Sequence, residues 1–165
     1  MCSESYLSDK DDFTAWVQEL AEAFHPEGLL VTAAVSANNE RIETSYDVPG
    51  ISTYLDHINI MTYDYHGSWD RKTGHGSPLY AHPDDTNLYF NTNYSINDWI
   101  SHGADPQKVI MGFPLYGQSF TLTDSSNHGL NAPSDSAGTA GEYTRQAGFL
   151  AYYEVISSLP FINYF

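Results

Sequence analysis

Three short apolar runs, separated from one another by helical patterns, constrain the fold of this chain most strongly. They span residues 29–35, 58–63 and 109–113. The first run is too short for a typical helix and rich in β-branched residues, so we interpret it as a strand covered on both faces. Strands that alternate with helices indicate parallel βα units rather than a sandwich of hairpins. The sequence therefore predicts an α/β fold.

The helical pattern is clearest between Ser8 and Phe24, where apolar side chains recur at three- and four-residue intervals. Those side chains are Phe13, Trp16, Val17, Leu20 and Phe24. Asp47 and Pro49 open a second, short helix. A third predicted helix carries Ile96, Trp99 and Ile100.

The pattern changes after Gln118. Residues 119–123 alternate as an antiparallel strand does, a stretch rich in Ser, Gly and Asn runs to Gly141, and residues 148–159 are predicted to form a helix. We interpret this segment as the start of an inserted α+β subdomain. The sequence therefore predicts a boundary between residues 1–118 and residues 119–165.

The charge of the chain disfavours two classes of partner. Six Lys and Arg against 21 Asp and Glu give a net charge of −15, which repels nucleic acid and anionic membranes. A neutral sugar polymer is not repelled, although an acidic surface that only confers solubility is the simpler alternative. The sequence indicates no metal, no cofactor and no protein partner. Cys2 is the single cysteine, which excludes an internal disulfide.

Residues 61–69, Met-Thr-Tyr-Asp-Tyr-His-Gly-Ser-Trp, form the densest group of reactive side chains. A buried parallel strand tolerates an ionisable group mainly at its carboxyl end, so Asp64 is the first candidate for chemistry. The alternative is that Asp64 only caps the following loop and Trp69 only packs. The loop of residues 67–93 exceeds about 15 residues, and its aromatic side chains favour a functional role.

Several segments together resemble the chitinases of glycoside hydrolase family 18. They are residues 29–37, 46–49, 61–69, 74–80, 113–120 and 151–155. The resemblance covers about residues 10–155 and implies a partial (β/α)₈ TIM barrel, roughly its strands five to seven, in residues 1–118. It also implies that residues 119–165 begin the α+β insertion, and that the protein is extracellular, although residues 1–5 lack the features of a secretory signal.

The resemblance implies substrate-assisted retaining hydrolysis of β-1,4-linked N-acetylglucosamine polymers, such as chitin. In that chemistry the acetamido oxygen of the sugar attacks the anomeric carbon. Asp64 and Tyr63 would hold the acetamido group and stabilise the oxazolinium-like intermediate. A separate general acid must protonate the leaving oxygen.

The resemblance also implies four substrate-binding residues. Met61 would form the floor of the sugar pocket, with plain core packing as the favoured alternative. Trp69 would offer a flat face for pyranose stacking, and Tyr116 would hydrogen-bond the substrate. Gln118 stands where many members have Arg. The nearby carboxylates Asp70 and Glu142 are predicted to be solvated surface groups.

The general-acid motif of the family, Asp-x-x-Asp-x-Asp-x-Glu, does not occur in the sequence. We therefore expect a chitinase fragment that is inactive alone, and an incomplete barrel of marginal stability because its strand edges stay unpaired. Two alternatives remain open. One is a chitin-binding, lectin-like protein without catalysis, and the other is a truncated gene product without an independent role.

Overall fold

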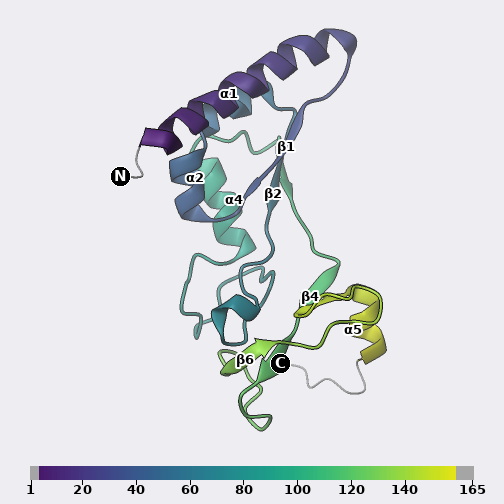
Figure 1. The fold of residues 1–165 in the computed structure, drawn as a ribbon. Coiled ribbons are helices and arrows are strands. Elements are labelled where there is room, and N and C mark those ends of the chain that lie inside the picture. The colour runs from purple at the N-terminus through teal and green to yellow at the C-terminus, as the bar shows by residue number, and fades with distance from the viewer. Residues whose placement is uncertain (1–3, 159–165) are drawn as a thin grey trace. The chain divides into compact units, whose positions relative to one another are not determined.

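A parallel sheet of three strands lies at the centre of the first part of the chain. In this computed structural model, which describes residues 4–158, the strands are β1 (Thr32–Ser36), β2 (His57–Met61) and β3 (Val109–Met111). They are hydrogen-bonded in that order, and both pairs are parallel. The prediction of a mixed α/β fold with parallel βα units is therefore confirmed (Figure 1).

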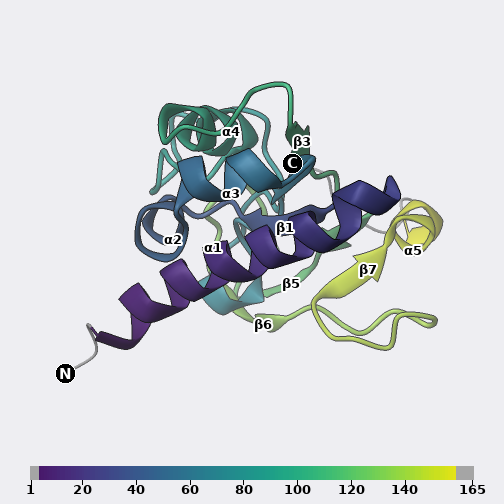
Figure 2. The same ribbon diagram turned by 90° about the horizontal axis from the view of Figure 1, so that it is seen from above.

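Four α-helices of the described residues belong to the same unit as this sheet. They are α1 (Glu4–Phe24), α2 (Asn39–Ser45), α3 (Val48–Tyr54) and α4 (Thr92–Ser101), with a single 3₁₀ turn, η1 (His25–Glu27), after α1. Helix α1 packs against α2 and α3, and α2 packs against α4 (Figure 2). Together with the sheet they form one compact unit, made of residues up to 62 and residues 89–112.

Helix α4 is fastened to the carboxyl end of β1. Trp99 is fully buried, and its Nε1 donates to the carbonyl oxygen of Ser36 at 2.9 Å. One turn earlier, the buried hydroxyl of Ser95 donates to the carbonyl oxygen of Ala37 at 2.7 Å. Both polar groups are thus satisfied inside an apolar core, which removes the penalty for burying them.

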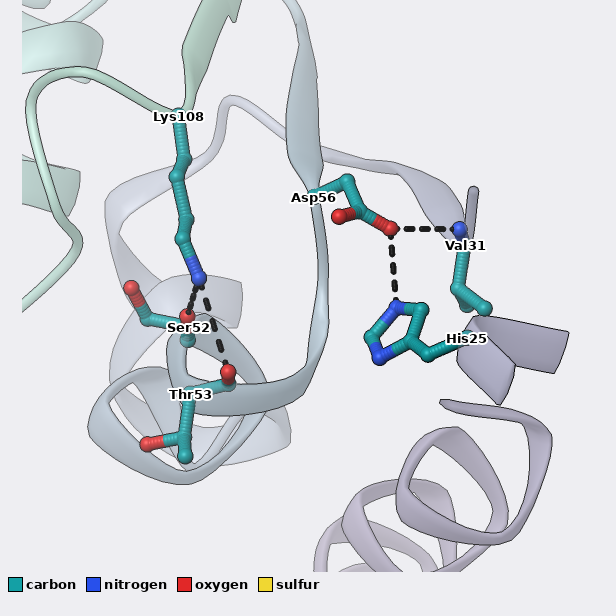
Figure 3. A network of polar contacts seen from close by, with 6 residues as sticks. All are labelled: His25, Val31, Ser52, Thr53, Asp56 and Lys108. Atoms are coloured by element: carbon teal, nitrogen blue, oxygen red, sulfur yellow. Dashed lines mark hydrogen bonds and ion pairs between the residues drawn. The ribbon is translucent and has the colours of Figure 1, made fainter. Parts of the chain in front are cut away.

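A polar network fixes the amino ends of the strands (Figure 3). Asp56, just before β2, accepts hydrogen bonds from the backbone N–H of Val31 at 2.7 Å and from His25 at 3.0 Å. The Val31 hydrogen bond holds the pKa of Asp56 below its ordinary value. Lys108, just before β3, donates to the carbonyl of Ser52 at 2.7 Å. These contacts lie at the amino ends of the strands, away from the carboxyl ends at which sites form in such folds, so we assign them to stability.

The second unit, residues 63–88 and residues from 113 on, contains two antiparallel strand pairs. Strand β4 (Tyr116–Gln118) pairs with β7 (Phe149–Ala151), and β5 (Phe120–Leu122) pairs with β6 (Ser134–Ala137). A 3₁₀ turn, η2 (Ser68–Asp70), and helix α5 (Tyr152–Ser158) complete this unit. The predicted antiparallel strand within residues 119–123 is confirmed as β5.

Three predictions from periodicity are wrong in detail. Leu29 and Leu30 are 54% and 65% exposed and precede β1. Thr32 and Ala34 are also exposed, so β1 is covered on one face only. Residues 149–151 form β7 rather than helix, because they pair with β4. The helix after them does exist as α5, and Leu159, its predicted last residue, lies outside the described residues.

Candidate functional site

Asp64 lies in a sharp turn shortly after strand β2. The strand ends at Met61, and the buried Thr62 donates its hydroxyl to the carbonyl of Gly112 at 2.7 Å, which fixes the end of the strand. Asp64 has a φ of 58°, in the left-handed region that few residues other than Gly, Asn and Asp adopt. This turn leaves its carboxylate exposed.

Two neutral polar side chains from strand β4 interact with the Asp64 carboxylate. The Gln118 amide Nε2 donates to Asp64 Oδ1 at 2.9 Å, and the Tyr116 hydroxyl lies close enough to the same carboxylate for it to raise the pKa of Tyr116. Tyr116 and Gln118 are two residues apart, and the alternation of a strand places them on the same face. Gly117, between them, faces Val155 on the other side. The β4 strand therefore presents both donors to one acceptor.

Aromatic packing orients the Tyr116 hydroxyl. The Tyr63 ring meets the Tyr116 ring edge-on, at 6.2 Å between centroids and 77° between planes. On β7, the Phe149 ring lies 4.5 Å from the Tyr116 ring at 33°. Burial, and then the hydrogen bond to Asp64, raise the pKa of Tyr116 well above its ordinary value, so it stays a protonated donor. Sequence reasoning missed Phe149 because it was assigned to a helix.

Trp69 stands on the 3₁₀ turn η2 and is 60% exposed. Asp70, next to it, is hydrogen-bonded to His66 Nδ1 at 2.9 Å and accepts from the backbone N–H of Gly67 at 3.3 Å. The prediction that Asp70 is a solvated surface group is therefore wrong, because its carboxylate closes this turn. Glu142 is exposed, as predicted.

The structure brings four of the six predicted site residues into contact: Tyr63, Asp64, Tyr116 and Gln118. Trp69 belongs to the same unit but stands on a separate turn. Met61 belongs to the first unit, where it is partly buried at the end of β2 and pairs with Ser36. Its role as a pocket floor stays a prediction.

Thr73, which sequence reasoning missed, anchors the loop that carries Trp69. This residue is 2% exposed, and its hydroxyl donates to the carbonyl of Gly129 at 2.7 Å and accepts from the N–H of Ala132 at 2.9 Å. Its backbone N–H donates to the Ala132 carbonyl at 2.9 Å, and its carbonyl accepts from Asn131 at 3.1 Å. The loop after η2 is thus fixed to residues 129–132, a contact that no local sequence pattern could signal.

Glu154 is a second anchor that sequence reasoning missed. Its side chain accepts hydrogen bonds from the backbone N–H groups of Tyr143 at 2.8 Å, Thr144 at 3.1 Å and Ala151 at 2.9 Å. Burial opposes ionisation of Glu154, but these hydrogen bonds outweigh it and lower the pKa to about 2. The carboxylate joins the start of α5 to the segment before β7.

Within residues 4–158, no group of three or more His, Cys, Asp or Glu side chains could hold a metal ion. No helix in the same range is both long and apolar enough to cross a bilayer.

The chain belongs to the glycosyl hydrolases family 18, whose family model matches residues 2–164. Among curated proteins, the chain is similar to Probable chitinase 10 of Drosophila melanogaster, with 58% identity over 154 residues. That match covers 93% of this chain and 7% of the Drosophila protein. The resemblance inferred from the sequence is therefore confirmed.

Solved structures agree. Catalytic domain 2 of the Ostrinia furnacalis Group II chitinase superposes with a TM-score of 0.91 and 47% identity, over 93% of this chain and 40% of that one. A mutant of that domain has been solved in complex with penta-N-acetylchitooctaose. Human YKL-39 is described as a pseudo-chitinase with retained chitooligosaccharide binding properties. It superposes with a TM-score of 0.87 and 40% identity, over 93% of this chain and 45% of the YKL-39 chain.

Proposed function

We propose that this chain binds β-1,4-linked N-acetylglucosamine chains through Tyr63, Asp64, Tyr116 and Gln118, which we call the acetamido clamp. The observation that carries the proposal is the exposed Asp64 carboxylate, which accepts a hydrogen bond from the neutral Gln118 amide and has the neutral Tyr116 hydroxyl beside it. The complex of the Ostrinia domain with an N-acetylated oligosaccharide supports the class of ligand. The partners we propose are therefore chitin and its oligosaccharides.

The chemistry of the clamp follows from its charges. When the acetamido oxygen attacks the anomeric carbon, a C–O bond forms, the glycosidic bond breaks, and positive charge develops on the acetamido group. A carboxylate beside the acetamido N–H stabilises that charge and fixes the group in line. Gln118 and Tyr116 orient Asp64 without neutralising it, because both donors are uncharged.

The leaving oxygen must take a proton from a general acid, and the family's acid motif does not occur in these 165 residues. We therefore propose that the polypeptide of this sequence does not hydrolyse chitin alone, since a missing acid costs about 10²–10⁴-fold in rate. Release of the chromophore from a chromogenic chitobioside, measured against a buffer blank, tests this. Turnover above the blank contradicts it.

We further propose a place for each part of the chain in the family fold. Strands β1, β2 and β3 would correspond to strands five to seven of a (β/α)₈ TIM barrel, within residues 1–118. Residues 119–165 would begin the α+β insertion. The antiparallel pairs β4–β7 and β5–β6 support a change of architecture near this boundary. An extracellular location follows from the same family membership and stays a proposal.

A non-catalytic, lectin-like role is the second candidate. The observation that favours it is the similarity to YKL-39, a pseudo-chitinase that binds chitooligosaccharides. Both candidates require the acetamido clamp and differ only in the acid. Transcript sequence across both ends of the coding region separates them, because a catalytic protein must encode the missing Glu.

Binding to chitin beads tests the clamp directly. Asp64→Asn removes the charge but keeps the size of the side chain and its tolerance of the left-handed turn. We expect binding about tenfold to a hundredfold weaker, as for the loss of a hydrogen bond to a charged group. Glu142→Gln, which removes an exposed carboxylate in the same unit, is the matched control and should bind as the unaltered chain does. Equal binding by both variants contradicts the proposal.

A further inference from the structure

The Gly67 backbone contacts the indole ring of Trp69. A Cβ added to Gly67 would overlap the six-membered ring of that indole, with the ring atoms Cη2, Cζ3 and Cζ2 nearest to it. The indole therefore lies directly on the Gly67 backbone. Since Trp69 is still 60% exposed, much of its surface beyond these ring atoms is open to solvent.

The backbone conformation does not explain why residue 67 is a glycine. Its φ of −166° and ψ of −173° are extended values that any residue adopts. An alanine methyl group at this position and the indole ring cannot occupy the same space, so a side chain at residue 67 would displace the indole.

Further contacts fix the turn between the two residues. The backbone N–H of Asp70 donates to the Gly67 carbonyl at 3.0 Å, and the Asp70 side chain accepts from the Gly67 N–H. His66, 7% exposed, holds the same Asp70 carboxylate at 2.9 Å. A few residues later in the chain, Thr73 hydrogen-bonds the loop to residues 129–132. The indole is thus carried by a turn that hydrogen bonds within the chain hold without any ligand.

We propose that Gly67 is a positioning residue that preorganises the Trp69 indole as a stacking platform for a pyranose ring. The identity of the ligand in this inference rests on the proposed function, whereas the contact between Gly67 and Trp69 does not depend on it. A rigid aromatic face binds a sugar without a further loss of side-chain entropy, whereas a displaced indole must be reordered at each binding event. Gly67 would therefore set affinity without touching the sugar.

The geometry is tested first, without ligand, by NMR of the unaltered chain. The Gly67 backbone lies against the indole, so ring currents should move at least one Gly67 Hα signal markedly from its ordinary position, and Trp69→Ala should abolish that shift. An unshifted Gly67 Hα contradicts the inference even if the chain binds chitin. The same spectra show whether each variant is folded.

Binding of chitotetraose then forms a double-mutant cycle. Gly67→Ala should weaken binding about tenfold in the presence of Trp69, the range expected for an aromatic contact, and have no further effect in the Trp69→Ala background. Gly129→Ala is the matched control, because it keeps the carbonyl that accepts from Thr73 and a Cβ there meets nothing within 4 Å, so it should leave binding unchanged. Additive effects of Gly67→Ala and Trp69→Ala overturn the inference, whereas failure of the unaltered chain to bind contradicts the proposed function instead.

Discussion

Different interactions stabilise the interior of each of the two units of this protein. The described core of buried apolar side chains lies almost entirely in the first unit; of its members only Tyr65 and Ala132 belong to the second. In the second unit, Thr73 and Glu154 bind backbone groups from distant segments. Large apolar side chains such as Phe113 and Leu115 are 75% and 71% exposed there.

The comparison shows that one kind of interaction stabilises the packed fold and another fixes the loops of the candidate site. Burial of apolar surface is strong but not directional, so it suits the packing of helices on a sheet. Hydrogen bonds to buried backbone groups are directional, and leaving them unmade is costly, so they suit loops that must hold one conformation. The candidate site residues lie mostly where directional contacts dominate.

The largest expected effect is on the first unit. Trp99→Ala removes a fully buried side chain and its hydrogen bond to Ser36, so we expect a loss of about 3–5 kcal/mol in the free energy of unfolding. Urea denaturation followed by circular dichroism measures it. Trp16→Ala is the control of the same chemistry, because Trp16 is 58% exposed, and its effect should stay within about 0.5 kcal/mol. Equal losses in both variants would break the comparison.

A smaller, local effect is expected in the second unit. Thr73→Val keeps the shape of the side chain but leaves the Gly129 carbonyl and the Ala132 N–H without their hydroxyl partner, at about 1–3 kcal/mol. Amide hydrogen exchange should accelerate in residues 66–74 and 129–134 but not in β1 or β2. Thr121→Val removes an exposed hydroxyl that donates to Ala137, and it should change little. Faster exchange throughout the sheet would show that the units are not separately stabilised.

The smallest expected effect appears only in acid. The pKa of Glu154, about 2, lies below the ordinary 4.5, so its ionisation stabilises the fold above about pH 4.5. That contribution is lost as the pH falls from about 4.5 toward 2. The amide proton shifts of Tyr143 and Thr144 should titrate with a midpoint near pH 2, and Glu154→Gln should remove this step. A midpoint near pH 4.5 would mean that the three hydrogen bonds are absent in solution.

Much of the first unit could be predicted from the sequence, because its determinants are periodic. Helix α1 was visible in the spacing of its apolar side chains, and β2 in its apolar run. Helix α2 was missed for a physical reason. Ile42 is its only buried residue, so it carries no amphipathic pattern, and the Asn38 side chain that caps it through the Arg41 N–H is a weak signal alone.

The second unit was harder to predict because its contacts join segments far apart in the chain. Residues 149–151 were assigned to a helix, and only their pairing with β4 makes them a strand. Tyr116 and Gln118 were named through the resemblance, but their common acceptor, Asp64, is visible only in the structure. The steric overlap that a side chain at position 67 would cause depends on where the Trp69 ring lies, and composition cannot reveal that placement.

Calorimetric titration with two neutral tetrasaccharides tests the acetamido clamp most directly. Chitotetraose and cellotetraose share the β-1,4-linked pyranose backbone, and only the first carries acetamido groups. We expect the chain to bind chitotetraose more tightly by about tenfold or more, and Asp64→Asn to remove most of that preference. Equal affinity for the two sugars, or a preference that survives Asp64→Asn, would contradict the assignment of Asp64 to the acetamido group.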